Sequence, residues 1–198
     1  SGVLTTESAA LYALASAGFQ PGEPAWKPWR RFDSSQLPPA TRHWLLDEGS
    51  LTAILQAACG NRLRVRVLRQ TWQRPRASER RALGLGTHEV ALVREVLLEC
   101  AGEPWVFARS IMPAATLRGR LRHLRRFGER SLGALLFSSR GLRREPFEVA
   151  LVRPGHGILP APPADGAAVW GRRSVFRVHG SPLLVAEFFL PACRLGSL

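Results

Sequence analysis

Apolar residues recur at three- and four-residue spacing over residues 41–60, a pattern typical of helices that pack one face against a core. A glycine interrupts the pattern directly before Ser50. We therefore expect two short helices, with the Ser50 side chain capping the second and Gly60 ending it. The same spacing predicts helices over residues 117–127 and 131–137, and the first of these two is strongly basic.

Elsewhere the period changes to two, which indicates strands. Residues 62–67 alternate arginine with leucine or valine, so one face of this strand is apolar and the other should carry solvated arginines. Residues 89–99 and 104–112 flank a short turn at 100–103 and are expected to pair as a hairpin. Residues 173–179 and 183–190 flank Gly-Ser-Pro and predict a second hairpin.

Consecutive hairpins with helices between them predict an α+β fold, a single antiparallel sheet with helices packed on one face. A further strand is expected at 145–152, and the Pro/Gly/Ala-rich residues 153–168 should form a loop. Residues 1–40 are rich in proline and tryptophan and are interpreted as an irregular N-terminal extension of one domain over 41–198. No apolar run reaches the length of a membrane span.

The charge balance leaves two kinds of partner open. Lysine and arginine number 28 against 15 acidic residues, for a net charge of +13, and Lys27 is the one lysine among them. Such an excess is typical of proteins that bind nucleic acid. It would equally raise the rate at which an enzyme meets a dianionic substrate.

Several kinds of chemistry are disfavoured by what the chain lacks. The cysteines Cys59, Cys100 and Cys193 are widely spaced without a CxxC pair, which argues against a disulfide framework or a zinc site. Neither HExxH nor a glycine-rich phosphate loop occurs. Because these motifs are absent, we expect no metal or nucleotide cofactor. The first residues make a poor secretion signal, so we expect a soluble cytoplasmic protein.

Two charged residues lie on strand faces that should be buried. Alternation places Arg94 among Leu92, Val96 and Leu98, and it places Glu187 among similarly large apolar neighbours. Buried charges are almost always paired or used, because desolvating them costs several kcal/mol. Either the two side chains pair with each other, or they line a pocket for a small anionic ligand. In the second case Arg94 would bind its carboxylate and Glu187 would exchange a proton or accept a hydrogen bond from a hydroxyl group.

At these strands the sequence resembles the bacterial chorismate pyruvate-lyase family. The resemblance is carried by residues 93–113, 131–139 and 170–191 and, more weakly, by 45–52. It implies a carbon–oxygen lyase that converts chorismate to 4-hydroxybenzoate and pyruvate, the first committed step of ubiquinone biosynthesis. It also implies a cofactor-free reaction in a pocket enclosed between the sheet and helical flaps.

The same resemblance implies roles for individual residues. Arg94 would bind the ring carboxylate, and Glu187 would contact the 4-hydroxyl group or the C4 proton. Leu132 would line the pocket, as would Leu51, which stands where the family often has methionine. Chorismate carries a second carboxylate, for which Arg109 is the expected partner because it lies on the adjacent strand; a purely structural or surface role for Arg109 is the alternative.

Two other functions remain as alternatives. The fold class also resembles effector-binding domains of bacterial transcription regulators, which would make the chain a non-catalytic binding module for small aromatic carboxylates. The net charge of +13 alone would favour a nucleic-acid binder, but the chain has one tyrosine and no evident platform for stacking bases. We expect a monomer that binds chorismate and 4-hydroxybenzoate and has no specific nucleic-acid partner.

Overall fold

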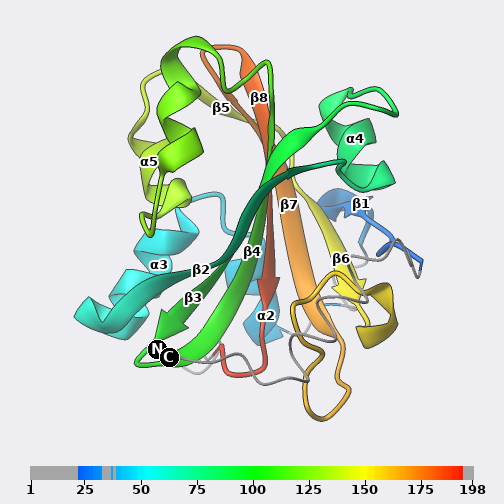
Figure 1. The fold of residues 1–198 in the computed structure, drawn as a ribbon. Helices are drawn as coiled ribbons and strands as arrows, with labels where there is room; N and C mark the ends of the chain where they lie inside the picture. The colour runs from blue at the N-terminus through cyan, green and yellow to red at the C-terminus, as the bar shows by residue number, and fades with distance from the viewer. Residues whose placement is uncertain (1–21, 33–36, 38, 194–198) are drawn as a thin grey trace.

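The structure, a computed structural model, describes residues 22–32, 37 and 39–193. Within them eight antiparallel strands form one sheet in the order β1-β6-β7-β8-β4-β3-β2, with β5 pairing to β7 outside this path (Figure 1). The strands are β1 (Lys27–Pro28), β2 (Leu63–Gln73), β3 (Ala91–Cys100), β4 (Glu103–Pro113), β5 (Leu142–Arg144), β6 (Glu148–Val152), β7 (Val169–Val178) and β8 (Ser181–Phe189). The predicted α+β class with a single antiparallel sheet is confirmed.

Both predicted hairpins are present, and each has a two-residue turn. Ala101 and Gly102 connect β3 to β4 with φ angles of 52° and 89°. His179 and Gly180 connect β7 to β8 with φ angles of 50° and 84°. Positive φ at both positions matches the right-handed twist of the paired strands. The second turn therefore ends at Gly180, and Ser181 already belongs to β8, so the turn lies earlier than the Gly-Ser-Pro triplet suggested.

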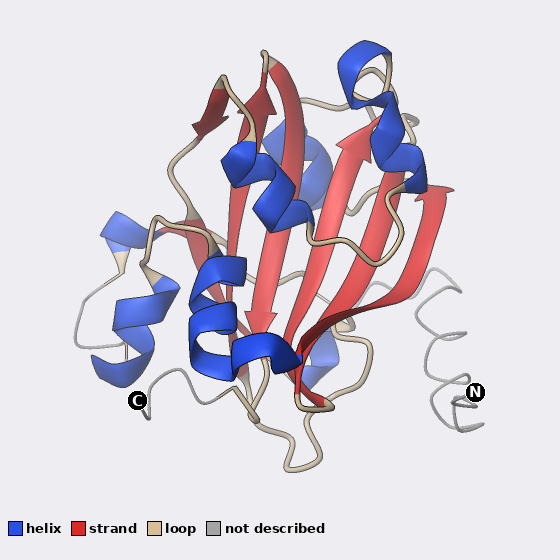
Figure 2. Ribbon diagram, turned by 90° about the vertical axis from the view of Figure 1, so that its left-hand side faces the viewer, coloured by secondary structure: helices blue, strands red, loops and turns tan. Residues whose placement is uncertain are grey.

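Four helices cover one face of the sheet: α2 (Pro39–Leu45), α3 (Leu51–Cys59), the 3-10 helix η4 (Gly119–Arg126) and α5 (Leu132–Ser138). Figure 2 looks onto this face, with α3 and α5 in front of the strands. The predicted cap of α3 is confirmed, because the Ser50 hydroxyl accepts a hydrogen bond from the Ala53 amide and Gly60 ends the helix. Ser131 caps α5 in the same way.

The other face of the sheet is also covered by helical segments, α4 (Ala77–Leu83) and the 3-10 helix η5 (Pro154–His156). Ala82 and Leu83 of α4 pack against a buried cluster that includes Val93 and Ile111. Residues 73–87 are largely polar, so hydrophobic periodicity gives only a weak signal for this helix. Its burial instead depends on ion pairs, which a hydrophobic pattern does not reveal.

The described part of the expected N-terminal extension packs against the sheet. Strand β1 pairs with β6. Trp26 contacts Phe188 edge-on at a ring distance of 6.0 Å, and Trp29 stacks on Phe147 at 5.9 Å. Residues 22–32 are thus integrated with the domain that was expected to begin at residue 41, whereas residues 1–21 lie outside the described part.

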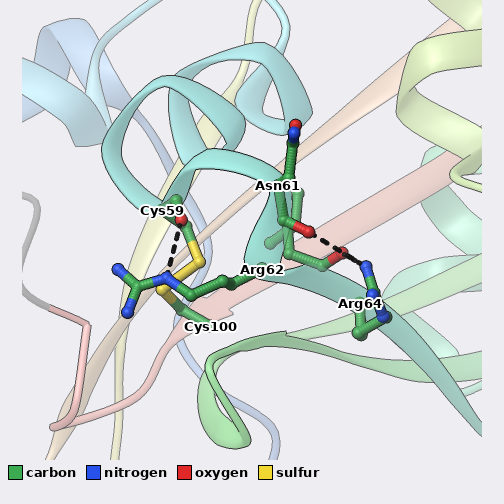
Figure 3. The surroundings of a disulfide bond; sticks show 6 residues. Cys59, Asn61, Arg62, Arg64 and Cys100 are labelled. Atoms are coloured by element: carbon green, nitrogen blue, oxygen red, sulfur yellow. Dashed lines mark hydrogen bonds between the residues drawn. A yellow bond between two sulfur atoms is a disulfide. The ribbon is translucent and has the colours of Figure 1, made fainter.

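Cys59 and Cys100 form a disulfide bond, contrary to the expectation from their spacing (Figure 3). Their Cα atoms lie 5.7 Å apart although 41 positions separate them in the sequence. The bond joins the last residue of α3 to the last residue of β3. The sequence pattern missed it because only the fold brings the end of this helix to the end of the strand.

Among the helices of the described residues, none combines the length and the apolar character that a membrane crossing requires.

Candidate functional site

A band of polar side chains divides the apolar core on the face covered by α3 and α5. One apolar cluster lies beneath α2 and α3 and includes Leu51 and Phe189. The other lies beneath η4 and α5 and includes Leu132 and Val185. Between them lie the residues that we call the polar belt: Arg94, Ser110, Arg144, Arg172, Ser174 and Glu187.

The register of the sheet explains why the belt residues share a face. Arg94 on β3 lies opposite Ser110 on β4. On the next rung, Ala108 of β4 lies opposite Glu187 of β8, which in turn lies opposite Arg172 of β7. Side chains at directly opposed positions point to the same face. Arg94 and Glu187 are two strands and two residues apart, or about 12 Å between Cα atoms at standard strand spacings. Their side chains can therefore contact opposite ends of one six-membered ring.

Arg94 is buried without a carboxylate partner among the described residues. It is 2% exposed, and its guanidinium donates to Gln70 Oε1 at 3.2 Å and to the Arg130 carbonyl oxygen at 3.1 Å. Its Cζ lies 5.7 Å from the centre of the Phe127 ring. Burial lowers the pKa of Arg94 below its ordinary value. A buried cation whose hydrogen-bond partners are all neutral retains an uncompensated charge that an anion can pair with.

Glu187 pairs with Arg172, not with Arg94 as one interpretation of the sequence held. Arg172 Nε donates to Glu187 Oε2 at 2.7 Å. Arg172 is 1% exposed, and its Nη1 donates to the carbonyl oxygens of Trp44 at 3.1 Å and Asp47 at 2.8 Å, at and just beyond the C-terminal end of α2. The Glu187 side chain retains 18% exposure, and its second oxygen makes no hydrogen bond within the described residues. That oxygen is available to a ligand.

The two helices that carry Leu51 and Leu132 meet on the same face as the belt. Each leucine is the first residue of its helix and is buried. Thr52 Oγ1 lies 2.7 Å from Ser131 Oγ, a hydrogen bond between the N-terminal ends of α3 and α5. At Gly133, a Cβ atom would come within 2.9 Å of Thr52 Oγ1, so glycine permits this close approach. The two leucines thus supply apolar surface on either side of the polar belt.

Arg109 lies on the opposite face of the sheet, which contradicts its expected position beside Arg94. It pairs across the hairpin with Glu95, and its Nε donates to Glu79 Oε1 of α4 at 2.7 Å while its Nη1 donates to Glu95. Burial alone would lower the pKa of Arg109, but the two carboxylates outweigh it and raise that pKa. The structure therefore gives Arg109 a buried ionic role beneath α4 and no access to the belt.

A β-bulge accounts for the error. The register shifts by one residue between Leu98 and Glu99. Counted from the turn alone, Arg109 would oppose Arg94; after the bulge, Ser110 takes that position and Arg109 moves to the other face. Arg172 and Arg144 of the belt were also missed by sequence reasoning. Arg172 lies just before the strand predicted at 173–179, whereas β7 begins at Val169, and Arg144 belongs to β5, a three-residue strand too short to show alternation.

The arrangement suits a small, flat, partly apolar ligand with an anionic group at one end. A buried guanidinium faces one side of the belt, a carboxylate–guanidinium pair lies further across it, and leucines flank both. No group of three His, Cys, Asp or Glu side chains that could hold a metal ion occurs within the part of the chain that the structure describes.

The sequence matches the family model described as chorismate lyase over residues 24–196. It is 48% identical over 151 residues to a protein of Methylococcus capsulatus named probable chorismate pyruvate-lyase, covering 75% of this chain and 93% of that protein. A protein of the same name from Halorhodospira halophila is 43% identical over 184 residues, or 88% of this chain and 94% of its own length. Among solved structures, the effector domain of PhnF from Mycobacterium smegmatis superposes with a TM-score of 0.52 at 18% identity, covering 74% of this chain and 91% of that structure. This last likeness concerns the fold alone.

Proposed function

Because the chain belongs to the chorismate lyase family, we propose that it converts chorismate to 4-hydroxybenzoate and pyruvate within the polar belt. The observation that carries this proposal is Arg94, a buried guanidinium with neutral partners, on the same sheet face as Glu187. A benzoate-like ring with its carboxylate at Arg94 would direct its para position toward Glu187. Leu51 and Leu132 would pack against the apolar ring.

The reaction is an elimination that makes the ring aromatic. The C4–H electrons form a new ring double bond, the bond between C3 and the ether oxygen breaks, and enolpyruvate departs and takes up a proton to become pyruvate. No electrons are gained or lost overall, so the reaction requires no oxidant or reductant, and we propose that it proceeds without a metal or nucleotide cofactor. The protein's task is to hold the reactive geometry and stabilise charge on the leaving group.

Glu187 is the group that we assign to the C4 end of the ring. Its free carboxylate oxygen would accept a hydrogen bond from the 4-hydroxyl group or take the C4 proton and pass it to the departing enolpyruvate. Arg172, held by carbonyl oxygens at the end of α2, fixes the other oxygen of Glu187. This orientation by a buried partner favours one position of the carboxylate throughout the reaction.

We further infer that the product enters ubiquinone biosynthesis and that the enzyme acts as a monomer in the cytoplasm, with no specific nucleic-acid partner. The family membership supports the first inference. Attraction of a dianionic substrate is sufficient to explain the high net positive charge without a nucleic-acid partner.

The test is incubation of the purified chain with chorismate in the presence of a metal chelator, followed by chromatography of the products. We expect equimolar 4-hydroxybenzoate and pyruvate. Formation of 3-hydroxybenzoate would keep the site and overturn the regiochemistry. Tight binding of 4-hydroxybenzoate without turnover would instead support a non-catalytic binding module.

A further inference from the structure

Chorismate has a second carboxylate, on the enolpyruvyl ether, and 4-hydroxybenzoate does not. If the proposed function holds, the site needs a second cation that serves the substrate and not this product. Arg109 cannot supply it, because it lies on the other face and is bound to Glu79 and Glu95. A second cation must come from the face that carries Arg94.

The arginines that are at least half buried differ in whether a carboxylate neutralises them. Arg172 on the site face has Glu187, and Arg173 on the opposite face has Glu148 at 2.7 Å. On the opposite face Arg76 has no carboxylate within ion-pair distance in the part of the chain that the structure describes, and it donates to the carbonyl oxygens of His156 and Gly157. On the site face, Arg94 and Arg144 likewise have no carboxylate within ion-pair distance among the described residues. The belt therefore contains one buried guanidinium group, Arg94, and one partly buried guanidinium group, Arg144, both held by neutral acceptors, and chorismate brings two carboxylates.

Neighbouring elements hold Arg144 in a defined position. It lies opposite Phe176 in the pairing of β5 with β7, which places it on the belt face. Its Nε donates to Ser174 Oγ at 2.9 Å and its Nη1 to the Glu48 carbonyl oxygen at 3.1 Å. Its Cζ lies 5.1 Å from the Phe147 ring and 5.3 Å from the Phe176 ring. The Nη2 donors make no hydrogen bond within the described residues, so a carboxylate can occupy them.

The electrostatic surroundings of Arg144 also favour an anion. Burial lowers the pKa of Arg144 most, and the nearby Arg172 lowers it further, whereas the carboxylates of Glu187, Glu48 and Asp47 raise it without outweighing the burial. The guanidinium thus lies close enough to the Arg172–Glu187 pair to sense both charges. A carboxylate placed against Arg144 would offset both the burial and the repulsion from Arg172.

The strand order matches the shape of the substrate. From β3 through β4, β8 and β7 to β5, the belt runs from Arg94 to Glu187, then to Arg172, and ends at Arg144. In chorismate the enolpyruvyl ether is attached to C3, beside the C4 carbon that we place at Glu187. We propose that Arg144 binds the enolpyruvyl carboxylate of chorismate and stabilises it as enolpyruvate departs.

The test compares substrate with product in Arg144→Gln, with Arg143→Gln as a matched control. Arg143 is the exposed preceding residue of the same strand. We expect Arg144→Gln to lower kcat/KM for chorismate by roughly 10- to 100-fold, the loss of a charge-assisted hydrogen bond, while the Kd of 4-hydroxybenzoate changes less than about twofold. Arg144→Lys should restore part of kcat/KM, and Arg143→Gln should change neither quantity.

Equal losses of chorismate turnover and 4-hydroxybenzoate affinity in Arg144→Gln would overturn the proposal, since they would indicate a structural role through Ser174 and Glu48. Unchanged kcat/KM would overturn it as well. If Arg144→Gln does not fold, the same comparison is made with Arg144→Lys, in which a smaller loss confined to chorismate is expected. Failure of the proposed function is distinguishable, because the wild-type chain would then not turn chorismate over at all.

Discussion

Two buried arginines on one hairpin, Arg94 and Arg109, should respond in opposite ways to replacement by methionine. They are 2% and 5% exposed and lie on opposite faces of the sheet. Arg94 has neutral partners and Arg109 has two carboxylates. Arg94→Met should therefore strongly weaken ligand binding with little effect on folding, and Arg109→Met should destabilise the fold with little effect on the site.

The magnitudes follow from the contacts. A hydrogen bond to a charged group contributes about 1.5–3 kcal/mol, so loss of a two-pronged contact to the ring carboxylate should weaken 4-hydroxybenzoate binding by roughly 10²- to 10⁴-fold. The unliganded Arg94→Met variant loses two hydrogen bonds to neutral acceptors and also loses a desolvated charge. These effects oppose each other, so its free energy of unfolding should change by less than about 1 kcal/mol.

Arg109→Met takes the shared cation away from Glu79 and Glu95. Breaking a buried ion pair from one side typically costs about 3–5 kcal/mol. Urea denaturation of the unliganded proteins measures the stability of each variant, and titration calorimetry with 4-hydroxybenzoate measures the affinity of those that fold. The reasoning would be refuted if Arg94→Met kept wild-type affinity, or if it destabilised the chain as much as Arg109→Met does.

Three further outcomes are expected. Glu187→Gln should lower kcat by about 10²-fold or more while changing the Kd of 4-hydroxybenzoate much less, and equal effects on both in steady-state kinetics and calorimetry would contradict its assignment to the reacting end. Replacing Cys59 and Cys100 by serine should lower the free energy of unfolding by up to about 4 kcal/mol for a loop of this length without changing kcat/KM; a wild-type urea transition that is insensitive to reductant would contradict the disulfide. Burial raises the pKa of Glu79, but interactions with Arg109 and Arg76 outweigh burial and lower this pKa below its ordinary value. The contribution of Glu79 to the free energy of unfolding is therefore fully present above about pH 4.5. It is lost as the pH falls through the lowered pKa of the folded state. Acid denaturation of Glu79→Gln should accordingly show a weaker pH dependence below pH 4.5 than the wild type, and identical profiles would refute this.

The sequence was sufficient to predict the hairpins and the shared face of Arg94 and Glu187. The alternation of apolar and polar residues within one strand does not depend on where the neighbouring turn lies. Arg94 and Glu187 could therefore each be placed on a buried face from their own strand alone. Pairing between strands was a different matter. The β-bulge after Leu98 places Arg109 on the opposite face of the sheet from the one predicted, and no residue type in that segment indicates a bulge.

The partner of Glu187 was missed for a related reason. A turn at Gly-Ser-Pro would have paired Glu187 with a valine of β7, whereas the actual turn at His179 and Gly180 pairs it with Arg172. His179 has a left-handed backbone conformation, which is uncommon for residues other than glycine, so a turn at His179 and Gly180 was less evident than one at Gly-Ser-Pro. Hydrophobic periodicity also gives only a weak signal for helix α4, because its Glu79 is buried through its ion pair with Arg109.

The most direct test of the account is a crystal structure of the chain with 4-hydroxybenzoate bound. We predict density for one molecule in the polar belt, with its carboxylate on the Arg94 guanidinium, its hydroxyl group within hydrogen-bonding distance of Glu187, and Leu51 and Leu132 against the ring. A ligand bound on the α4 face beside Arg109, or one in the belt with its carboxylate away from Arg94, would contradict it.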